Sequence, residues 1–511
     1  MVYIMNQYKN ELPEFIEKTD LFYSGQMSMK DYKGFSGFYG SYSQKGGKAN
    51  MLRLRMPGGV ISKETFNFVV NTMKEYNVSR AHFTTCQTIQ LHDLTKEQLY
   101  PIYENVLDFG IVPLGGGGDF PRNVMCSPLS GVQKDECFDV LPYAKKASDY
   151  LLTLIKAEKM PRKLKVGFSN SKDNVTHATF RDLGFVACQD GTFDVYCAGG
   201  LGNNPRFGLQ VATKVNPENI LYYIKAMRDT FLQHGNYSNR AKARTRYMIE
   251  AVGGNDTFIE IFNKNLDEAF KEDLKIEVCP SIVSKKGEDS IEGYTILPQK
   301  QDGLYSVLYH PIGGSPDLNT LIALNETIQN MEDVQLRLSP DESCYIINLT
   351  AKEAKLVQDV ISSDNAQSIF ETSVSCIGAS TCQVGLRDSQ ALLQSCIQAV
   401  RQANIPCQSL CQIHISGCPS SCGTHQIGQI GFRGHTKLVD KKPASAFMLY
   451  ICGNDRQGEE TMGKEVGAIL QDKIPEFLVE LGTIITNDHC TFNEWIQKNP
   501  DGIEKIAQKY I

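Results

Sequence analysis

Alternation of apolar and polar residues predicts a strand in each of two corresponding parts of the chain. The segment "CQIHIS", from Cys411, alternates in this way, and so does "RKLKV" within "PRKLKVGF", from Pro161. On the latter strand Lys163 and Lys165 are two positions apart, which places both side chains on one face. The strand from Cys411 ends just before "CPSSC", so two cysteines follow at a tight turn, where backbone amides become available to a ligand.

Two shorter stretches have the pattern of small α+β units. Residues 46–112 are predicted as a strand, a helix near 62–76, a second strand and a helix near 96–109, and residues 300–363 follow the same order. The last helix of each unit is expected to begin with a capping box, formed by Thr95 with Gln98 and by Thr350 with Glu353.

These units belong to an internal repeat. Landmarks recur along the chain at a near-constant separation: Gly58-Gly59 with Gly313-Gly314, Cys126 with Cys376, and "DLGF" with "QIGF". A chance match rarely keeps its register through several landmarks. We therefore expect a duplication related by a pseudo-two-fold axis.

The repeat suggests a division of the chain into domains. Each small α+β unit precedes a larger α/β unit, at residues 113–252 in the first half and 366–511 in the second. Residues 1–45 are expected to form an N-terminal arm. The charged, turn-rich stretch 253–299, which contains "SKKGEDSIEG", is expected to link the halves.

The two halves differ in their chemistry. The first half has cations where the second has apolar residues, as Arg53, Lys163 and Lys165 correspond to Leu308, Ile413 and Ile415. The second half has three cysteines, at positions 382, 418 and 422, for which the first half has none in register. At a pseudo-dyad interface the cations and the thiols could face each other across one site.

Composition narrows the classes of protein. The chain has 511 residues, of which 41% are hydrophobic and 22% charged, as expected for a globular protein. The net charge of −6 argues against a general nucleic-acid binder. Because no apolar run reaches the length of a membrane span and no signal-peptide pattern opens the chain, we expect no membrane association and a cytoplasmic location. Sixteen cysteines are too dilute for a disulfide scaffold.

Four cysteines are distinguished by their spacing. Cys376 and Cys382 lie in "CIGASTC", and Cys418 and Cys422 lie in "CPSSC". Two close pairs of thiolates suit an iron–sulfur cluster or a tetrahedral zinc, and gaps of five and three residues favour the cluster. The alternative is that these are four buried cysteines on two turns.

The cations of the first half suggest an anion pocket. Arg122 follows the loop "GGGGDFP", whose glycines allow close backbone approach, and Arg53, Lys163 and Lys165 lie on predicted strands. A solvated basic face is the alternative for any one of them. The loop "AGGLG", with Gly199, Gly200 and Gly202, could admit a flat cofactor or a phosphate, or be a plain turn.

Taken together, the motifs resemble a known family. "CIGASTC" followed by "HISGCPSSCGTHQIGQIGF" resembles the cluster signature of the siroheme-dependent sulfite and nitrite reductases. "MLRLRMPGGVI", "FPRNVMC", "MPRKLK" and "AGGLG" resemble further blocks of that family in the same order, between about residues 46 and 455. The resemblance implies an α+β, internally duplicated sulfite/nitrite reductase fold. It would consist of two ferredoxin-like half-domains and two larger α/β siroheme and cluster domains.

The resemblance also implies roles for individual residues. A 4Fe-4S cluster would be held by Cys376, Cys382, Cys418 and Cys422, with Cys422 also the axial ligand of the siroheme iron. The substrate would be surrounded by Arg53, Arg122, Lys163 and Lys165. Siroheme would be lined by Thr84, Thr85, Gln87, Gln90, His92, Gly199, Gly200 and Gly202. The chain departs from the family at His82 and Cys86, where arginines usually pair with siroheme carboxylates; we interpret Cys86 as a packing residue.

The expected activity is the six-electron reduction of sulfite to sulfide, with electrons supplied by a separate donor protein such as ferredoxin. Lys165 favours sulfite, because the family resemblance places lysine there in sulfite reductases and asparagine in nitrite reductases. Nitrite reduction to ammonia is the alternative within the family. A siroheme-less iron–sulfur electron-transfer subunit is the alternative outside it, although it would not need an anion pocket.

Overall fold

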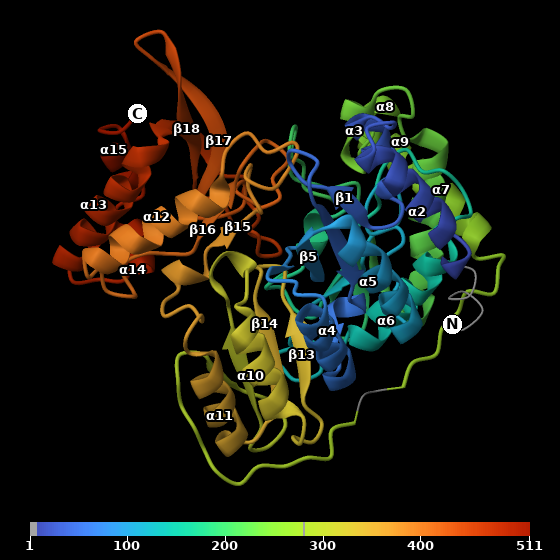
Figure 1. Ribbon diagram of the computed structural model, residues 1–511, viewed down its shortest axis with the longest axis horizontal. Coiled ribbons are helices and arrows are strands. Elements are labelled where there is room, and N and C mark those ends of the chain that lie inside the picture. The colour runs from blue at the N-terminus through green and yellow to red at the C-terminus, as the bar shows by residue number, and fades with distance from the viewer. Residues whose placement is uncertain (1–7, 280–281) are drawn as a thin grey trace.

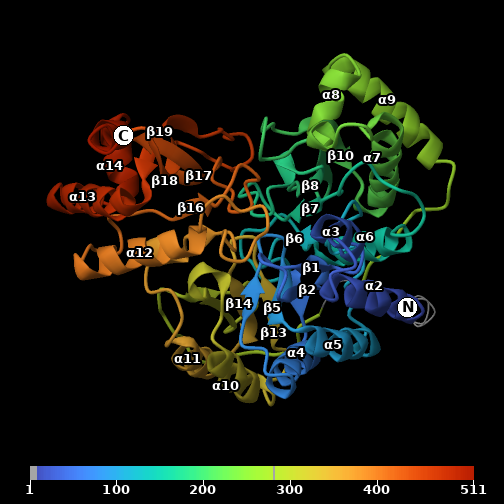
Figure 2. The same ribbon diagram turned by 45° about the horizontal axis from the view of Figure 1, so that its top comes forward.

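The computed structural model describes residues 8–279 and 282–511. Figures 1 and 2 show three lobes, one with α4, α5, α10 and α11, one with α6 to α9, and one with α12 to α15. Each lobe has its own hydrophobic core. No helix in the described part of the chain is both long enough and apolar enough to cross a membrane.

The first small unit contains a four-stranded antiparallel sheet in the order β1-β2-β5-β4. Its strands are β1 (Ser41–Ser43), β2 (Asn50–Arg55), β4 (Ala81–Phe83) and β5 (Thr88–Leu94). Helices α4 (Lys63–Glu75) and α5 (Lys96–Phe109) confirm the two predicted helices. The predicted capping box of Thr95 and Gln98 is present at the start of α5. The segment expected as an N-terminal arm includes two helices, α2 (Leu12–Tyr23) and α3 (Met29–Ser36).

The second small unit has a similar arrangement of strands and helices, but its sheet includes one strand from the first half. Its sheet has the order β11-β12-β14-β13-β3, and β3 (Val60–Ile61) comes from the first half. The other strands are β11 (Ile296–Pro298), β12 (Tyr305–Tyr309), β13 (Gln335–Leu338) and β14 (Cys344–Leu349). Helices α10 (Leu318–Ile328) and α11 (Ala351–Ile361) cover it, and α11 begins with the predicted capping box.

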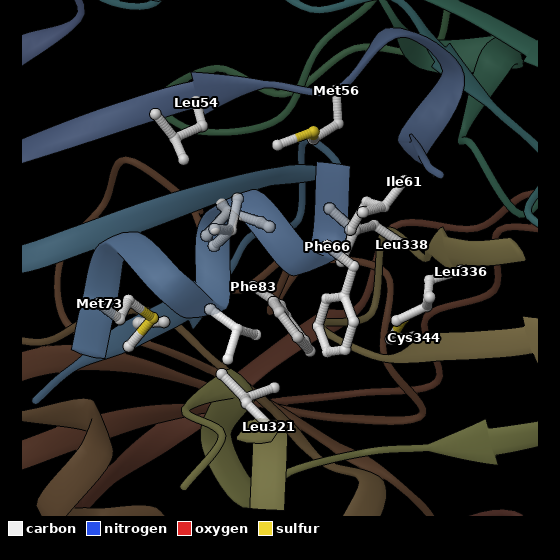
Figure 3. Packing of buried hydrophobic residues seen from close by; sticks show 14 of the residues in the cluster. Leu54, Met56, Ile61, Phe66, Met73, Phe83, Leu321, Leu336, Leu338 and Cys344 are labelled. Atoms are coloured by element: carbon white, nitrogen blue, oxygen red, sulfur yellow. The ribbon is translucent and has the colours of Figure 1, made fainter. Parts of the chain in front are cut away.

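The two small units share one hydrophobic core. Figure 3 shows Phe66 and Phe83 of the first half beside Leu321, Leu336 and Leu338 of the second. All five side chains are at most 3% exposed. Apolar burial contributes about 25 cal/mol per Å² removed from water, so each half is stabilised by the other.

The larger unit of the first half is built on a five-stranded sheet in the order β10-β9-β8-β7-β6. The strands are β6 (Met125–Cys126), β7 (Val166–Ser169), β8 (Leu183–Ala187), β9 (Phe193–Cys197) and β10 (Leu209–Val215). The helices are α6 (Leu141–Thr153), α7 (Ile220–His234), α8 (Met248–Ala251) and α9 (Asn255–Ala269). The expected linker 253–299 therefore begins with a packed helix, because Phe258 and Phe262 of α9 are fully buried in this core.

The larger unit of the second half has a five-stranded sheet in the order β15-β16-β17-β18-β19. The strands are β15 (Val374–Ser375), β16 (Ile413–Ser416), β17 (Ile430–Val439), β18 (Lys442–Ile451) and β19 (Lys464–Leu470). The helices are α12 (Ser389–Gln402), α13 (Ile474–Asn487), α14 (Phe492–Lys498) and α15 (Gly502–Ala507). Strand β16 confirms the strand predicted from "CQIHIS". In both larger units the first three strands in chain order pair in parallel, and the fourth strand then pairs antiparallel with the third.

Contacts between the halves occur in symmetric pairs, which confirms the duplication. A β-carbon on Gly59 would lie 2.7 Å from the Leu338 carbonyl oxygen, and one on Gly314 would lie 2.8 Å from the carbonyl oxygen of Phe83. Both glycines have positive φ, where residues with a β-carbon are strained. The glycine pairs that mark the repeat are therefore the points where the two halves approach most closely around the pseudo-dyad.

Backbone hydrogen bonds show the same symmetry. The Lys45 amide donates to the Thr381 carbonyl at 2.9 Å, and the Lys300 amide donates to the Val132 carbonyl at 2.9 Å. Each bond joins the turn between the first two strands of a small sheet to a loop of the opposite half, which in one case carries Cys376 and Cys382 and in the other is its counterpart. The two halves therefore enclose the region between them.

Candidate active site

A cavity of about 1390 Å³ lies between the halves. This exceeds the volume of roughly 300–1,000 Å³ that is usual for small-molecule sites. The first half contributes the β4–β5 turn and the segments around Arg122 and Lys163. The second half contributes the two loops that carry the cysteine pairs.

The wall of this cavity is strongly basic. It includes thirteen lysine and arginine side chains against four carboxylates, although the whole chain has a net charge of −6. Like charges gathered at a partly buried site repel each other and are stabilised by bound anions. The cavity is therefore suited to anionic ligands.

Arg53 and Arg122 are held together by the glycine-rich loop. Both guanidinium groups donate to the carbonyl oxygen of Gly116, Arg122 at 2.7 Å. Burial, together with the neighbouring charge of Arg53, lowers the pKa of Arg122 to about 10. The Nε atom of Arg122 is buried and has no hydrogen-bond partner among the described residues. The pair therefore retains donor capacity for an anion.

The loop needs its glycines for this approach. A β-carbon on Gly117 would lie 2.5 Å from the Tyr42 hydroxyl oxygen and 2.6 Å from the Gly37 carbonyl. Such contacts are too short for any side chain. The sequence "GGGG" thus allows the loop to pack against the arm and to present its carbonyl groups to the arginines.

Lys163 and Lys165 both line the cavity, as the alternating pattern predicted. They precede β7 rather than lie on it, and Leu164 between them forms an isolated parallel bridge with Pro121. Burial and the charge of Lys165 lower the pKa of Lys163 well below its ordinary value. Lys163 therefore gives up its proton more readily than an exposed lysine does.

Three charged residues of the site were missed by the sequence analysis. Asp182 is fully buried, accepts the Lys165 backbone amide at 2.8 Å and pairs with Arg244 at 3.0 Å. Arg181 lines the cavity and donates through Nε to the Thr176 carbonyl at 2.8 Å. The dipeptide "RD" directly before strand β8 was the available signal.

The basic run "NRAKARTRY" contributes to this site as well. Arg240 donates to Asp119, and Arg244 pairs with Asp182, and all four residues line the cavity. The segment includes a short 3-10 helix, Arg240–Lys242. Arg244 is therefore anchored inward with only 18% of its side chain exposed, whereas the side chain of Arg240 remains 63% exposed.

The β4–β5 turn brings most of the predicted siroheme-lining residues to the cavity. The residues that line it are Thr84, Thr85, Gln90 and His92, together with Gly200. With its oxygen toward Arg53, the Gln90 amide accepts from Arg53 Nε at 3.3 Å and donates to His92 Nε2 at 3.2 Å. The Thr85 hydroxyl donates to the Cys422 carbonyl at 3.1 Å. This turn therefore contacts both the arginine site and the cysteine loop.

Three predicted lining residues lie outside the cavity wall. Gln87 is fully buried, and its amide donates to the carbonyls of Cys126 and Leu338, at 2.8 and 2.5 Å. Gly199 packs against the Phe180 backbone, and Gly202 exchanges two hydrogen bonds with the side chain of Gln426. All three residues have structural contacts, and their assignment to the macrocycle stays a prediction.

The four cysteines of the second half all line the cavity. The Gly417 amide donates to the Cys376 sulfur at 3.2 Å, as expected for a loop that directs backbone amides at thiolates. A β-carbon on Gly423 would lie 2.0 Å from the Ile415 carbonyl, so this turn requires glycine. The small residues around the cysteines thus let the two loops approach each other.

The chemistry of these donors fits a cluster. Burial and the neighbouring Cys422 raise the pKa of Cys376 to about 12. Burial also raises the pKa of Cys422, with Cys418 and Cys382 adding to the effect and Lys163 opposing it. Four thiolates are therefore costly together unless cationic iron compensates their charge. Among the described residues, no three His, Cys, Asp or Glu side chains are arranged to hold a single metal ion.

The cavity also fits siroheme, a flat macrocycle with several carboxylates. Its volume and its excess of cations match a large polyanion. The buried Nε atoms of Arg122 and Arg244 have no hydrogen-bond partner within residues 8–279 and 282–511. Residues on the wall that could hold the macrocycle are Thr84, Thr85, Gln90, His92, Arg181 and Arg244.

His82, at a position where the family resemblance implies an arginine, pairs with Glu342 of the second half. Its Nε2 lies 3.8 Å from the Glu342 carboxylate, and both residues line the cavity. Burial lowers the pKa of His82 to about 4 and raises the pKa of Glu342 well above its ordinary value. His82 is therefore uncharged at neutral pH, and burial favours the uncharged form of Glu342. This pair cannot supply the positive charge of the missing arginine.

Comparison with known proteins gives matches along most of the chain. A family model described as "Nitrite and sulphite reductase 4Fe-4S domain" matches residues 117–270, and one described as "Nitrite/Sulfite reductase ferredoxin-like half domain" matches residues 42–108. The ferredoxin–nitrite reductase of Synechococcus elongatus is 26% identical over 452 residues, 84% of this chain and 86% of that protein. Sulfite reductase [ferredoxin] 1 of Mycolicibacterium paratuberculosis is 25% identical over 396 residues, 75% of this chain and 69% of that protein.

The fold has a close match among solved structures. The NirA protein of Mycobacterium tuberculosis superimposes with a TM-score of 0.77 at 21% identity, covering 94% of this chain and 93% of that one. At this identity the match concerns the fold. Together with the family models and the curated relatives, it shows that the chain is an oxidoreductase of the nitrite and sulfite reductase family, whose cofactors are siroheme and a 4Fe-4S cluster.

Proposed function

We propose that this chain reduces sulfite to sulfide with six electrons from a ferredoxin-type donor. The observation that carries the proposal is the second lysine of the anion site. Lys165 lines the cavity beside Lys163; Lys163 in turn is close to Arg122, and Arg122 is close to Arg53. A dianion gains more from each additional cation than a monoanion does.

The arginines would bind and orient the substrate. Arg53 and Arg122 share Gly116 as an acceptor, so their guanidinium groups are fixed before the anion arrives. Donors that are already fixed lose little conformational freedom when the anion binds, and their hydrogen bonds to it strengthen as water is excluded. Their role is to hold the oxygens of the anion.

The lysines would supply protons. Removal of three oxygens as water consumes protons at each step, and Lys163 releases its proton readily because its pKa is far below the ordinary value. Lys165 is placed by the bond from its amide to Asp182. Siroheme coupled to a 4Fe-4S cluster supplies single electrons and the iron that binds the anion.

The thiols would hold the metal centres. We assign Cys376, Cys382 and Cys418 to the cluster, and Cys422 to both the cluster and the siroheme iron. The contact from Thr85 to the Cys422 carbonyl, at 3.1 Å, supports this assignment, because it fixes this cysteine against the half that carries the cations.

The proposal of ferredoxin as the electron donor rests on the names of the curated relatives. The names of the Synechococcus elongatus and Mycolicibacterium paratuberculosis proteins both include ferredoxin. A small acidic carrier of this kind would deliver electrons one at a time.

We also propose that the domain bounds follow the repeat, with the linker restricted to the segment after α9.

Nitrite is the second candidate substrate, and one observation favours it. The Lys165 ammonium donates to the Cys86 sulfur at 3.2 Å, so its charge is shared with a protein group. Among the curated relatives, the Synechococcus elongatus, Zea mays and Arabidopsis thaliana proteins are named as nitrite reductases. A less positive site suits the smaller monoanion.

Product analysis with the purified holoenzyme and reduced ferredoxin tests the proposal. Sulfide formed from sulfite with a higher specificity constant than ammonia formed from nitrite would support it. A preference for nitrite would replace sulfite by the second candidate. Absence of both products would contradict the proposed reductase activity.

A further inference from the structure

Cys86 has a fixed position on the wall of the active-site cavity. It lies in the β4–β5 turn, where its backbone amide donates to the Thr84 hydroxyl oxygen at 3.3 Å. The Asn123 side chain donates to the Cys86 carbonyl at 3.1 Å and to the Gln87 carbonyl at 3.0 Å. The turn is therefore held on both sides of the cysteine. This placement corrects the interpretation of Cys86 as a packing residue.

The thiol of Cys86 contacts a cation of the substrate site. Lys165 Nζ donates to Cys86 Sγ at 3.2 Å, within hydrogen-bonding distance for sulfur. An ammonium group binds a thiolate more strongly than a neutral thiol, because the bond is then assisted by charge. The contact therefore favours the ionised form of Cys86.

Other cations face the same sulfur from neighbouring segments. Arg181 and Lys163 act on Cys86 in addition to Lys165, and Cys86 in turn acts on Arg122. Burial works to raise the pKa of Cys86, but the combined positive charge lowers it to about 6. The second half contributes Cys422, whose carbonyl is bound by the adjacent Thr85. At neutral pH the sulfur is thus a thiolate within a cluster of cations.

We propose that Cys86 is a specificity-determining residue of the anion site, whose thiolate pairs with the Lys165 ammonium and weakens the preference for a dianion over a monoanion. This inference rests on the proposed function, since it concerns the choice between sulfite and nitrite. A substrate anion in the cavity interacts both with the Lys165 ammonium and with the negatively charged Cys86 thiolate beside it. The attraction to a second negative charge on the substrate is reduced accordingly.

Two substitutions separate the charge of Cys86 from its shape. Cys86→Ser removes the thiolate with little change in size and leaves Lys165 free, whereas Cys86→Asp keeps a negative charge beside Lys165. We expect the ratio of specificity constants for sulfite over nitrite to rise roughly tenfold in Cys86→Ser. In Cys86→Asp it stays near the native value. An unchanged ratio in Cys86→Ser, or an equal rise in both variants, overturns the proposal.

A second measurement is independent of activity. The tryptic peptide from Ala81 to Lys96 contains Cys86 and no other cysteine, so alkylation of this thiol can be followed by mass spectrometry. In the holoenzyme its rate should reach half-maximum near pH 6, following the pKa of about 6. Removal of the partner in Lys165→Met should lower the rate at neutral pH roughly tenfold.

The matched control is Lys163→Met, which removes a cation of the same site without the contact to Cys86, so the midpoint should move less than in Lys165→Met. A midpoint above about pH 8 in the native enzyme, or no labelling of Cys86 at any pH, overturns the inference. These outcomes do not depend on turnover. A failure of the proposed reductase function would therefore be distinguishable from a failure of this inference.

Discussion

Gln87 and Glu342 occupy the same position in the two halves and show how the duplicated parts diverged. Both have positive φ, 53° and 69°, and they lie in corresponding turns, β4–β5 in the first half and β13–β14 in the second. The Gln87 side chain accepts the Cys126 amide at 2.9 Å, and the Glu342 side chain accepts the Ser375 amide at 3.0 Å. The structural contact was kept while the chemical group changed.

The same comparison holds for the two larger units. Lys163 and Lys165 face the cavity from the first half, and the cysteine loops face it from the second. Symmetry around the pseudo-dyad maintains the backbone contacts that close the cavity. In the proposed function the site depends on the loss of symmetry, because the cations of one half would bind the anion and the thiols of the other half would bind the metal centres. The following predictions test that distinction, beginning with the largest effect.

Corresponding cysteines in the two halves should respond very differently to substitution. Cys376→Ala removes a thiol of the cavity wall, and we expect loss of the cluster, of the siroheme signal and of activity together. Cys126→Ala changes the first-half thiol that the sequence repeat aligns with Cys376; in the structure Cys126 takes the position of the neighbouring Ser375 and is fully buried in a core. That variant should keep its iron and its spectrum. Iron analysis and absorption spectra of both variants measure this, and equal iron loss in the two would contradict the division between halves.

The arginine site can be tested by giving one half the residue of the other. Arg53→Leu introduces the residue type found at Leu308, and it should weaken anion binding by about 2–5 kcal/mol, or roughly 30-fold or more in KM. Metal content should not change. Lys242→Met, at an exposed lysine, is the charge control. A KM equal to the native value in Arg53→Leu would place this arginine outside the substrate site.

Lys165 provides a finer test of substrate choice. Lys165→Asn removes an ammonium group while keeping a hydrogen-bond donor, so sulfite turnover should fall and nitrite turnover should be spared. We expect the sulfite-to-nitrite ratio of specificity constants to drop roughly tenfold. Steady-state kinetics with a reduced dye as donor gives this ratio. If the ratio does not move, the charge argument for sulfite is wrong.

The smallest effect is expected at Glu342. Its raised pKa means that the folded state holds a proton that the unfolded state releases above the ordinary value near 4.5. Stability should therefore fall as pH rises above that value. Glu342→Gln, which copies Gln87, should be within about 1 kcal/mol of native at low pH and lose less stability as pH rises. Thermal unfolding at several pH values measures the difference. A parallel decline in both proteins would show that Glu342 is not the group responsible.

Local features of this fold were predictable from the sequence. Helices α4 and α5 and both capping boxes depend on signals within a few residues, and they are present as predicted. The cysteine pairs and the two lysines were also found, because their spacing is local. Helix α9 was missed since its charged surroundings concealed the apolar face that Phe258 and Phe262 bury.

Features that depend on tertiary contacts were not predictable in the same way. The ion pair of Asp182 and Arg244 joins residues far apart in sequence. The family resemblance assigned Gln87 to the cofactor, but the sequence did not show that its side-chain amide donates to the carbonyls of Cys126 and Leu338. The contact of Cys86 with Lys165 likewise arises only when the β4–β5 turn meets the segment before β7.

The central claim is that one cavity joins the cations of the first half to metal centres held by the second. The absorption spectrum of the purified protein, recorded before and after addition of sulfite and of nitrite, tests it most directly. The account predicts bands of an iron macrocycle that shift when either anion is added, and that no longer shift in a double variant Arg53→Leu, Arg122→Leu that retains its iron. A spectrum without macrocycle bands, or bands that shift equally in the double variant, would contradict it.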